Sequence, residues 1–480
     1  MKRFKTIPIA VLLLVWITQW PLAVRAQDPQ QNGAPPKPAA KALPPIGDED
    51  NQEDEQPIPA MQPDNLPVTG FQDLTVGTPP ERHSYWVPGF SYTNFISSNA
   101  EGAGAANSGW YTTSILTGNL SLLQNWSRAQ LALNYSGGGS FSSNSTIGNS
   151  QFQQLGMFQT FSWRRVRLTF LDQFAYLPAA QFGFGAGTGL ALPGVGGPLA
   201  PVVPGLQNGL TPSQSIFNTI GPRYSNTSGV QFNFLLSPRS SITVGGVFSL
   251  LRFTEPGNIE SNDVILNAGY NYQISRSDTF GISYRFSAYE YIGSPQAIGD
   301  HTVLATYAKR ITGRMALKLA GGPEITTFRL PPGVTPSTQN NAVAGSADLT
   351  YSLPTWNLAV DYNHGVNNGS GILLGATTDQ VTLSGNRKFG RVWNGNLSFG
   401  YARNTPIAGT TTNQAPTFDS VYVGAGLQRP LSRAANLTFN YTANIQTSNT
   451  GTCPGPTCAN FTTNQITIGL NWNSRPFVLH

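Results

Sequence analysis

The sequence predicts an all-β fold, a transmembrane antiparallel β-barrel of about 18 strands with 16 as the fallback. Three observations carry this prediction. Polar and apolar residues alternate along many segments, tight and long connections alternate between those segments, and only 11% of the 480 residues are charged. A soluble domain would have roughly 25% charged residues. The 26 Phe, 17 Tyr and 9 Trp argue against a disordered chain, which is usually poor in aromatic residues.

The amino terminus has the pattern of an export signal. Lys2, Arg3 and Lys5 precede an apolar stretch at 7–23, and the small residue Ala26 follows it. Residues 1–26 are therefore predicted to be a signal peptide that is cleaved after Ala26. An uncleaved membrane anchor is the alternative. After this stretch, no segment approaches the ~20 apolar residues that a spanning helix needs.

Residues 27–82 have a different composition. They are rich in Pro, Gln and Ala and contain the acidic run DEDNQEDE, Asp48–Glu55. Because few of these residues could build a core, the segment is predicted to be a disordered periplasmic tail. The acidic run is either simply solvated or docks a periplasmic or other envelope protein.

Residues 83–480 carry the two-residue alternation. In NLTFNYTANIQT, 436–447, six amide or hydroxyl side chains alternate with apolar or aromatic ones, and SDTFGISYRFSAYEYI (277–292) and ITIGLNWN (466–473) sort the same way. Successive side chains of a strand point to opposite faces, so each segment has one wet and one dry face. Segments of roughly ten such residues separated by turns are typical of an outer-membrane barrel.

The connections between these segments fall into two classes. Tight turns, such as SPRSS and PLSRA, alternate with long connections rich in Gly, Ser, Asn and Pro. Short turns belong to the periplasmic side of such barrels and long loops to the outer side, so both termini are expected in the periplasm. An even strand number then requires a first strand within 84–96, although Pro88 interrupts its pattern.

Tryptophan provides an independent check of this topology. Trp163, Trp356, Trp393 and Trp472 fall at strand ends that the turn lengths assign to the periplasmic side. Aromatic girdles mark the interfaces of membrane barrels, because indole has an apolar body and a polar N–H. The two lines of reasoning agree.

A closed barrel explains why strands have one wet and one dry face. A bilayer offers no hydrogen-bond partners, so spanning strands must close without a free edge. About eight strands pack solid, whereas 16–18 leave an aqueous channel that the polar faces would line. A soluble β-helix or adhesin is the alternative, but it would not explain the aromatic face or the two turn classes.

The segment from residue 83 to residue 480 resembles a bacterial outer-membrane β-barrel of the porin type. The features that match are the export signal, the alternating strands, the turn and loop rhythm and the end segment ITIGLNWN, although the chain continues through SRPFVLH. The resemblance implies the outer membrane of a Gram-negative-type bacterium, with membrane lipid and small solutes as partners. It implies passive diffusion; the alternative is a non-conducting structural, assembly or partner-binding barrel. Whether the barrel forms a homo-oligomer is left open.

Assigning faces by alternation predicts which charged residues line the channel. Mid-strand charges are expected to point inward, because Arg or Lys on the lipid face costs about 2–4 kcal/mol at the midplane. Because five of the candidates are basic and two are acidic, the channel is expected to prefer anions. The alternative is that these residues are ordinary lumen residues that pair with one another. The predicted channel-lining residues are Arg128, Arg167, Arg285, Lys318, Asp348, Asp361 and Lys388.

The stretch Pro178–Arg223 is predicted to be the third outer loop, which in porins folds inward and narrows the channel. It is apolar, rich in Gly and Pro and free of acidic residues. Such a loop would make a greasy constriction if it entered the lumen. Packing over the mouth or against a neighbouring protomer are the alternatives.

The remaining motifs predict no chemistry. Cys453 and Cys458 are the two cysteines, and in an exported protein they most simply form one disulfide. Four histidines are present, and His364 is expected on the lipid-facing side without a serine that can be assigned next to it. No enzymatic activity, cofactor, metal or nucleic-acid partner is therefore expected.

Overall fold

The computed structural model describes most of the region that carries the alternating pattern. The predicted signal peptide (1–26), the predicted tail (27–82) and both cysteines lie outside the described residues, as does most of 178–223. The described residues are 84–98, 109–144, 148–177, 216, 222–254, 257–329, 339–390, 392–407, 416–449 and 460–479.

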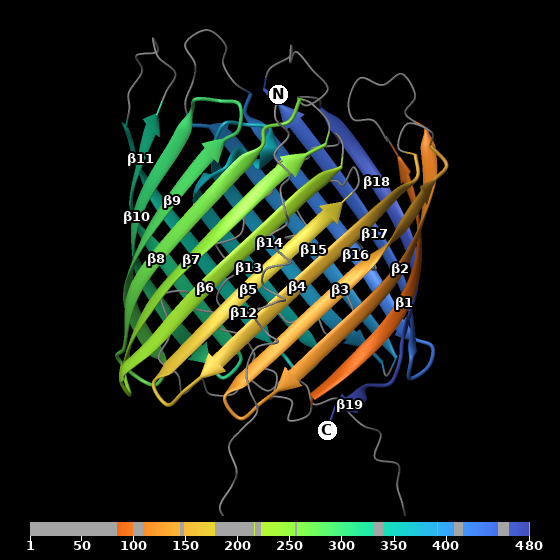
Figure 1. Cartoon of the computed structure of the whole chain (residues 1–480), viewed down its shortest axis with the longest axis horizontal. Coiled ribbons are helices and arrows are strands. Elements are labelled where there is room, and N and C mark those ends of the chain that lie inside the picture. The colour runs from red at the N-terminus through yellow and green to blue at the C-terminus, as the bar shows by residue number, and fades with distance from the viewer. Residues whose placement is uncertain are drawn as a thin grey trace, which may run out of the picture. The chain divides into compact units, whose positions relative to one another are not determined.

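Within these residues the chain forms one closed sheet of antiparallel strands (Figure 1). Each strand pairs with its neighbours in sequence, and β1 pairs with β18, which closes the ring and confirms the prediction of 18 strands. The strands are β1 (Ser84–Ser98), β2 (Trp110–Asn125), β3 (Ala129–Ser142), β4 (Ser150–Ser162), β5 (Val166–Leu177), β6 (Arg223–Ser237), β7 (Ser240–Phe253), β8 (Ser261–Gln273), β9 (Asp278–Tyr291), β10 (Ala297–Thr312), β11 (Met315–Arg329), β12 (Gln339–Ser352), β13 (Trp356–Asn367), β14 (Ala376–Phe389), β15 (Trp393–Pro406), β16 (Phe418–Pro430), β17 (Ala435–Ser448) and β18 (Phe461–Asn473).

The seam of the barrel uses the residues beyond ITIGLNWN. Strand β18 pairs with Gly89 to Ser97 of β1, and the short strand β19 (Phe477–Leu479) continues this antiparallel pairing to Ser84. The rings of Trp86 and Phe477 stack across this seam with their centroids 4.7 Å apart. The carboxyl-terminal extension therefore lengthens the closing edge.

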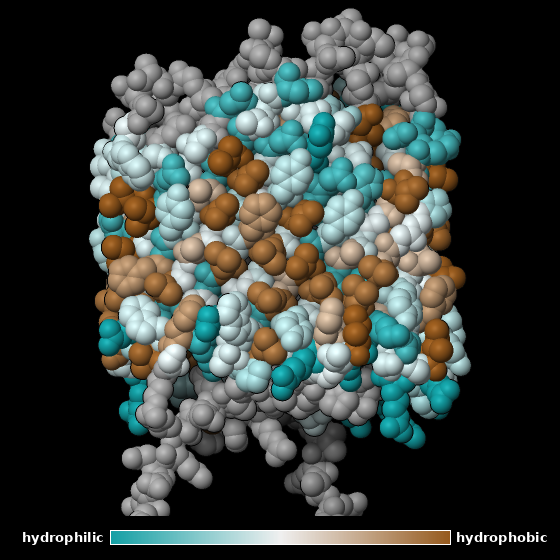
Figure 2. Space-filling view, turned by 180° about the vertical axis from the view of Figure 1, so that it is seen from behind, coloured by the Kyte–Doolittle hydropathy of each residue, from teal (hydrophilic) through white to brown (hydrophobic). Residues whose placement is uncertain are grey.

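The two faces of each strand differ as the alternation predicts. In β17, Phe439 and Tyr441 point outward and are 38% and 42% exposed, whereas Asn444 and Gln446 point inward and are 4% and 1% exposed. Figure 2 shows the outer surface from one side, with hydrophobic side chains gathered in a middle band and hydrophilic ones more frequent towards both ends. Such an apolar band, with polar groups on both sides of it, is expected of a surface that faces the hydrocarbon layer of a membrane.

The two ends of the barrel differ in their connections. We call the end with the tight turns the turn rim and the opposite end the loop rim; they are the lower and upper ends in Figure 1. The predicted tryptophan girdle is found at the turn rim, where Trp163, Trp356 and Trp472 are exposed. Arg387 covers the Trp356 ring with its guanidinium carbon 4.4 Å from the ring centroid.

Within the described residues, no helix is long and apolar enough to cross a membrane.

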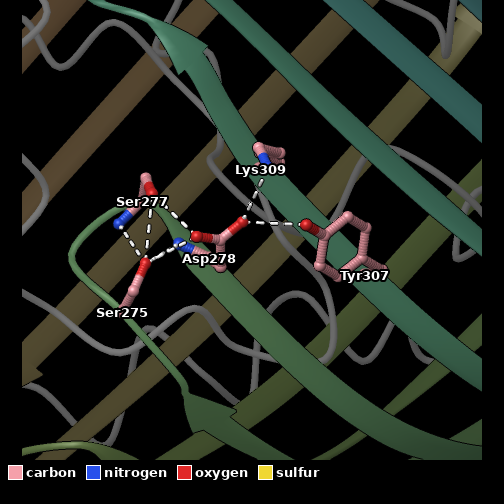
Figure 3. Close-up of polar contacts among 5 residues, drawn as sticks. All are labelled: Ser275, Ser277, Asp278, Tyr307 and Lys309. Atoms are coloured by element: carbon pink, nitrogen blue, oxygen red, sulfur yellow. Dashed lines mark hydrogen bonds and ion pairs between the residues drawn. The ribbon is translucent and has the colours of Figure 1, made fainter.

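A polar cluster on the outer face fixes one of these tight turns (Figure 3). The carboxylate of Asp278 accepts hydrogen bonds from Ser275 Oγ at 2.6 Å, Ser277 Oγ at 2.7 Å and Tyr307 OH at 2.8 Å. Lys309 Nζ lies 3.5 Å from the same carboxylate. The turn between β8 and β9 is thus tied to β10 where the apolar band ends.

Candidate functional site

The candidate site is a segment of the chain that folds into the lumen near the loop rim. Residues 365–375, GVNNGSGILLG, comprise the end of β13 and its connection to β14, which contains the short 3-10 helix η3 (Gly369–Gly371). Gly369, Gly371 and Gly375 have φ of +78°, +78° and +85°, a region that L side chains rarely adopt. These glycines let the chain turn back on itself within a few residues. We call residues 365–375 the inward segment.

The inward segment is bonded to the inner face of strands on another part of the wall. Asn368 donates from Nδ2 to Asp263 Oδ2 on β8 at 2.8 Å, and Glu324 Oε1 on β11 accepts from the Val366 amide at 3.2 Å. Tyr289 and Tyr291 of β9 donate to the carbonyls of Val366 and Asn368, each at 3.3 Å. Since these partners are inward-facing, the segment lies inside the lumen.

Apolar contacts complete the seating of the segment. Val366 packs in a cluster with Tyr289, Tyr291 and Ile298. A second cluster joins Leu373 to Ala376 and Phe418 at the starts of β14 and β16, and it includes Ile216. Ile216 belongs to the connection between β5 and β6, so this connection reaches the inner face of strands far from its own. The rest of the predicted inward loop, 178–223, lies outside the described residues except for 222 and 223, and its course stays a prediction.

Charged side chains line the lumen wall beneath the inward segment. On β9, Arg285 donates from Nη2 to Thr302 Oγ1 on β10 at 3.5 Å. The Asp300 carboxylate accepts from Thr302 at 2.9 Å and from Thr326 of β11 at 3.2 Å. Glu324 stands opposite Thr302 in the register, so these side chains form one patch across β9, β10 and β11.

A second charged row lies nearer the turn rim. Lys318, Asp348 and Asp361 stand directly opposite one another on β11, β12 and β13, on the inner face. Lys318 Nζ is 3.7 Å from Asp348 Oδ2, and Asp361 Oδ2 accepts from Thr382 Oγ1 of β14 at 3.3 Å. Like charges placed directly opposite in a sheet destabilise each other, so the lysine offsets part of the repulsion between the two aspartates.

The seven charged residues singled out in the sequence fall into two groups. Arg285 and the row of Lys318, Asp348 and Asp361 lie on neighbouring strands along one wall, as described above. The other three lie at the turn rim and are exposed: Arg128 in the turn before β3, Arg167 as the second residue of β5 and Lys388 as the penultimate residue of β14. Alternation gives the face of a residue but not its height along the barrel. Their role as channel-lining residues stays a prediction.

Three inward carboxylates were missed in the sequence. Asp263, Asp300 and Glu324 are 2%, 0% and 0% exposed and point to the inner face. The signal was present, because Asp263 alternates with the exposed Val264 and Leu266 in SNDVILNAGY. All three lie in the part of their strands that is nearer the long connections.

The architecture is that of a porin-type outer-membrane barrel: 18 antiparallel strands, an apolar outer face and a polar inner face. No protein-family model and no curated protein match the chain.

The solved structures that are similar to this chain include an outer membrane protein. The outer membrane protein opdK from Pseudomonas aeruginosa shares 9% identity at a TM-score of 0.41, covering 81% of this chain and 99% of its own. OccK2 (OpdF) from the same organism, solved in complex with glucuronate, has 9% identity, a TM-score of 0.41 and coverages of 82% and 98%. OccAB4 of Acinetobacter baumannii has 10% identity, a TM-score of 0.40 and coverages of 83% and 100%. Likeness at this level assigns no solute to this chain.

Proposed function

We propose that the barrel is a passive channel for small solutes across the outer membrane of a Gram-negative-type bacterium. The observation that carries the proposal is the inner face of 18 strands that close on themselves; it is mainly polar, with apolar clusters around Leu171 and Phe152. A ring of 16–18 strands is wide enough to leave an aqueous channel. Hydroxyl and amide side chains on that face can replace water contacts of a passing solute without binding it tightly.

The inward segment sets where the channel is narrow. It is held by hydrogen bonds to three other strands and by two apolar clusters, so it restricts the loop-rim half of the lumen. Solutes that pass it reach a wall of side chains on β8–β13 that includes the Lys318, Asp348 and Asp361 row. Selection by size is therefore expected at the segment, and selection by charge below it.

Electrical recording tests this proposal directly. The purified full chain, inserted in a planar bilayer in 1 M KCl, should give stable stepwise increases of current, and liposomes that contain it should swell in small sugars. A sample denatured before insertion is the control. Correctly folded protein that gives neither steps nor swelling would support the non-conducting structural or partner-binding barrel instead. Docking of an envelope protein by residues 27–82 and homo-oligomer formation stay separate predictions.

The proposal includes no enzymatic reaction. His364 Nδ1 lies 2.6 Å from Asp379 Oδ1, and the phenol of Tyr362 donates to the same oxygen at 3.1 Å. This group is on the outer face of β13 and β14 near the loop rim, as the sequence predicted for His364. Its third member is a tyrosine, and a serine or cysteine nucleophile does not take part in these contacts.

A further inference from the structure

The charge inside the barrel is concentrated on one wall. Among the described residues of β8–β13 that face the lumen, acidic side chains outnumber basic ones. Arg285, Arg310 and Lys318 are basic. On the remaining strands the described inward charges stand near the rims, as Arg167, Arg223 and Lys388 do. The acidic residues of the wall are Asp263, Asp300, Glu324, Asp348 and Asp361.

The segments that could enter the lumen do not offset this charge. Residues 178–221 contain no Asp, Glu, Lys or Arg, and neither does the inward segment. Among the described residues, the charge inside the lumen therefore comes from the strands.

Several of these carboxylates have spare hydrogen-bonding capacity. Glu324 is fully buried, and its Oε2 has no hydrogen-bond partner among the described residues; Asp263 Oδ1, on a side chain 2% exposed, is in the same position. In the second row one lysine faces two aspartates that stand directly opposite each other. A carboxylate oxygen without a donor can accept a hydrogen bond from an ammonium group, and an ionised carboxylate favours a cation nearby.

We propose that the β8–β13 wall makes the channel selective for small cations over anions. These cations are inorganic ions or organic ammonium ions. The inference rests on the proposed function and names its solute class. It reverses the sign expected from the sequence, because three of the five predicted basic residues stand at the turn rim. Asp348 and Asp361 are the pore-facing part of the wall and carry the proposal. Asp263, Asp300 and Glu324 are buried beside the inward segment, and the proposal does not depend on their charge.

The size of the effect follows from Coulomb's law. A unit charge about 8 Å from an ion in water, at an ionic strength of 0.1 M with a Debye length of about 10 Å, changes the cation-to-anion permeability ratio about twofold. Removal of one carboxylate should lower the ratio about twofold, and removal of the lysine should raise it by a similar factor.

The experiment is the reversal potential of the full chain in a KCl gradient, with the variants Asp361→Asn, Asp348→Asn and Lys318→Gln. Asp172→Asn is the matched control, because Asp172 lies on the outer face of β5, where Asn226 and Ser228 donate to its carboxylate at 3.1 and 2.9 Å. Potassium should permeate better than chloride in the original protein. The aspartate variants should lower the preference, the lysine variant should raise it, and the control should leave it unchanged.

Each result bears on the proposal. Opposite shifts for the aspartate and lysine variants support it, since a general loss of structure would not move the ratio in both directions. Channel steps with a chloride preference, no preference, or variants that leave the ratio unchanged overturn the cation selectivity alone. The absence of channel steps from correctly folded protein overturns the proposed function and the cation selectivity together.

Discussion

Replacement of Asn368 by alanine should release the inward segment and widen the channel. The side chain of Asn368 is 2% exposed; it donates to the Asp263 carboxylate at 2.8 Å and accepts from the Ser370 amide at 3.2 Å. A hydrogen bond to a charged group contributes about 1.5–3 kcal/mol and a neutral one about 1 kcal/mol. A loss of about 3 kcal/mol shifts the ratio of seated to released segment roughly a hundredfold.

Single-channel recording measures this change. Asn368→Ala should show a larger mean conductance and more frequent transitions between current levels than the original protein. Asn363→Ala is the matched control, because Asn363 is an exposed residue on the inner face of β13, the strand that leads into the inward segment. Heat-modifiable migration in detergent gels checks that both variants retain the barrel. If Asn368→Ala folds and its conductance and current fluctuations equal those of the control, the inward segment does not form the constriction.

Three further predictions concern the barrel wall. Phe439→Arg should destabilise the barrel by about 2–4 kcal/mol in urea unfolding from vesicles, because it places a charge in lipid. Asn440→Arg places its charge on the inner face and should have a much smaller effect. Equal costs for the two variants would contradict the assigned faces. Arg387→Gln should lower stability by about 0.5–1 kcal/mol through loss of its contact with Trp356, and no change would show that the contact is only geometric. Phe477→Ala removes the stacking at the seam and should cost about 0.5–1.5 kcal/mol beyond its area burial, read in the same assay; an unchanged unfolding midpoint would show that β19 does not support closure.

The strands could be predicted because their signal is local. The two-residue alternation in segments such as 436–447 depends on what each face touches, and this information is contained within the segment itself. The first strand was found by a global argument, since periplasmic termini and an even count required it despite Pro88.

The constriction could not be predicted, because its determinants are not local in the sequence. In the sequence, GVNNGSGILLG resembles any glycine-rich connection. Its course depends on a bond between Asn368 and Asp263, which are 105 residues apart, and on Tyr289 and Glu324 on two further strands. The height of charged residues was also hidden, which is why Arg128 and Lys388 were grouped with the mid-lumen row. The pairing of Cys453 with Cys458 and the signal peptide at 1–26 stay predictions.

The most direct test of the account is the environment of alternate residues along one strand. Nitroxide labels placed singly from Leu437 to Gln446, in a chain whose two cysteines are replaced by serine, report collision rates with oxygen and with a water-soluble nickel complex. The account predicts a strict two-residue alternation, with oxygen favoured at positions 439, 441 and 445 and nickel favoured at 440, 442 and 444. Uniform accessibility along the strand, or nickel favoured at Phe439 and Tyr441, would contradict a barrel that separates lipid from water.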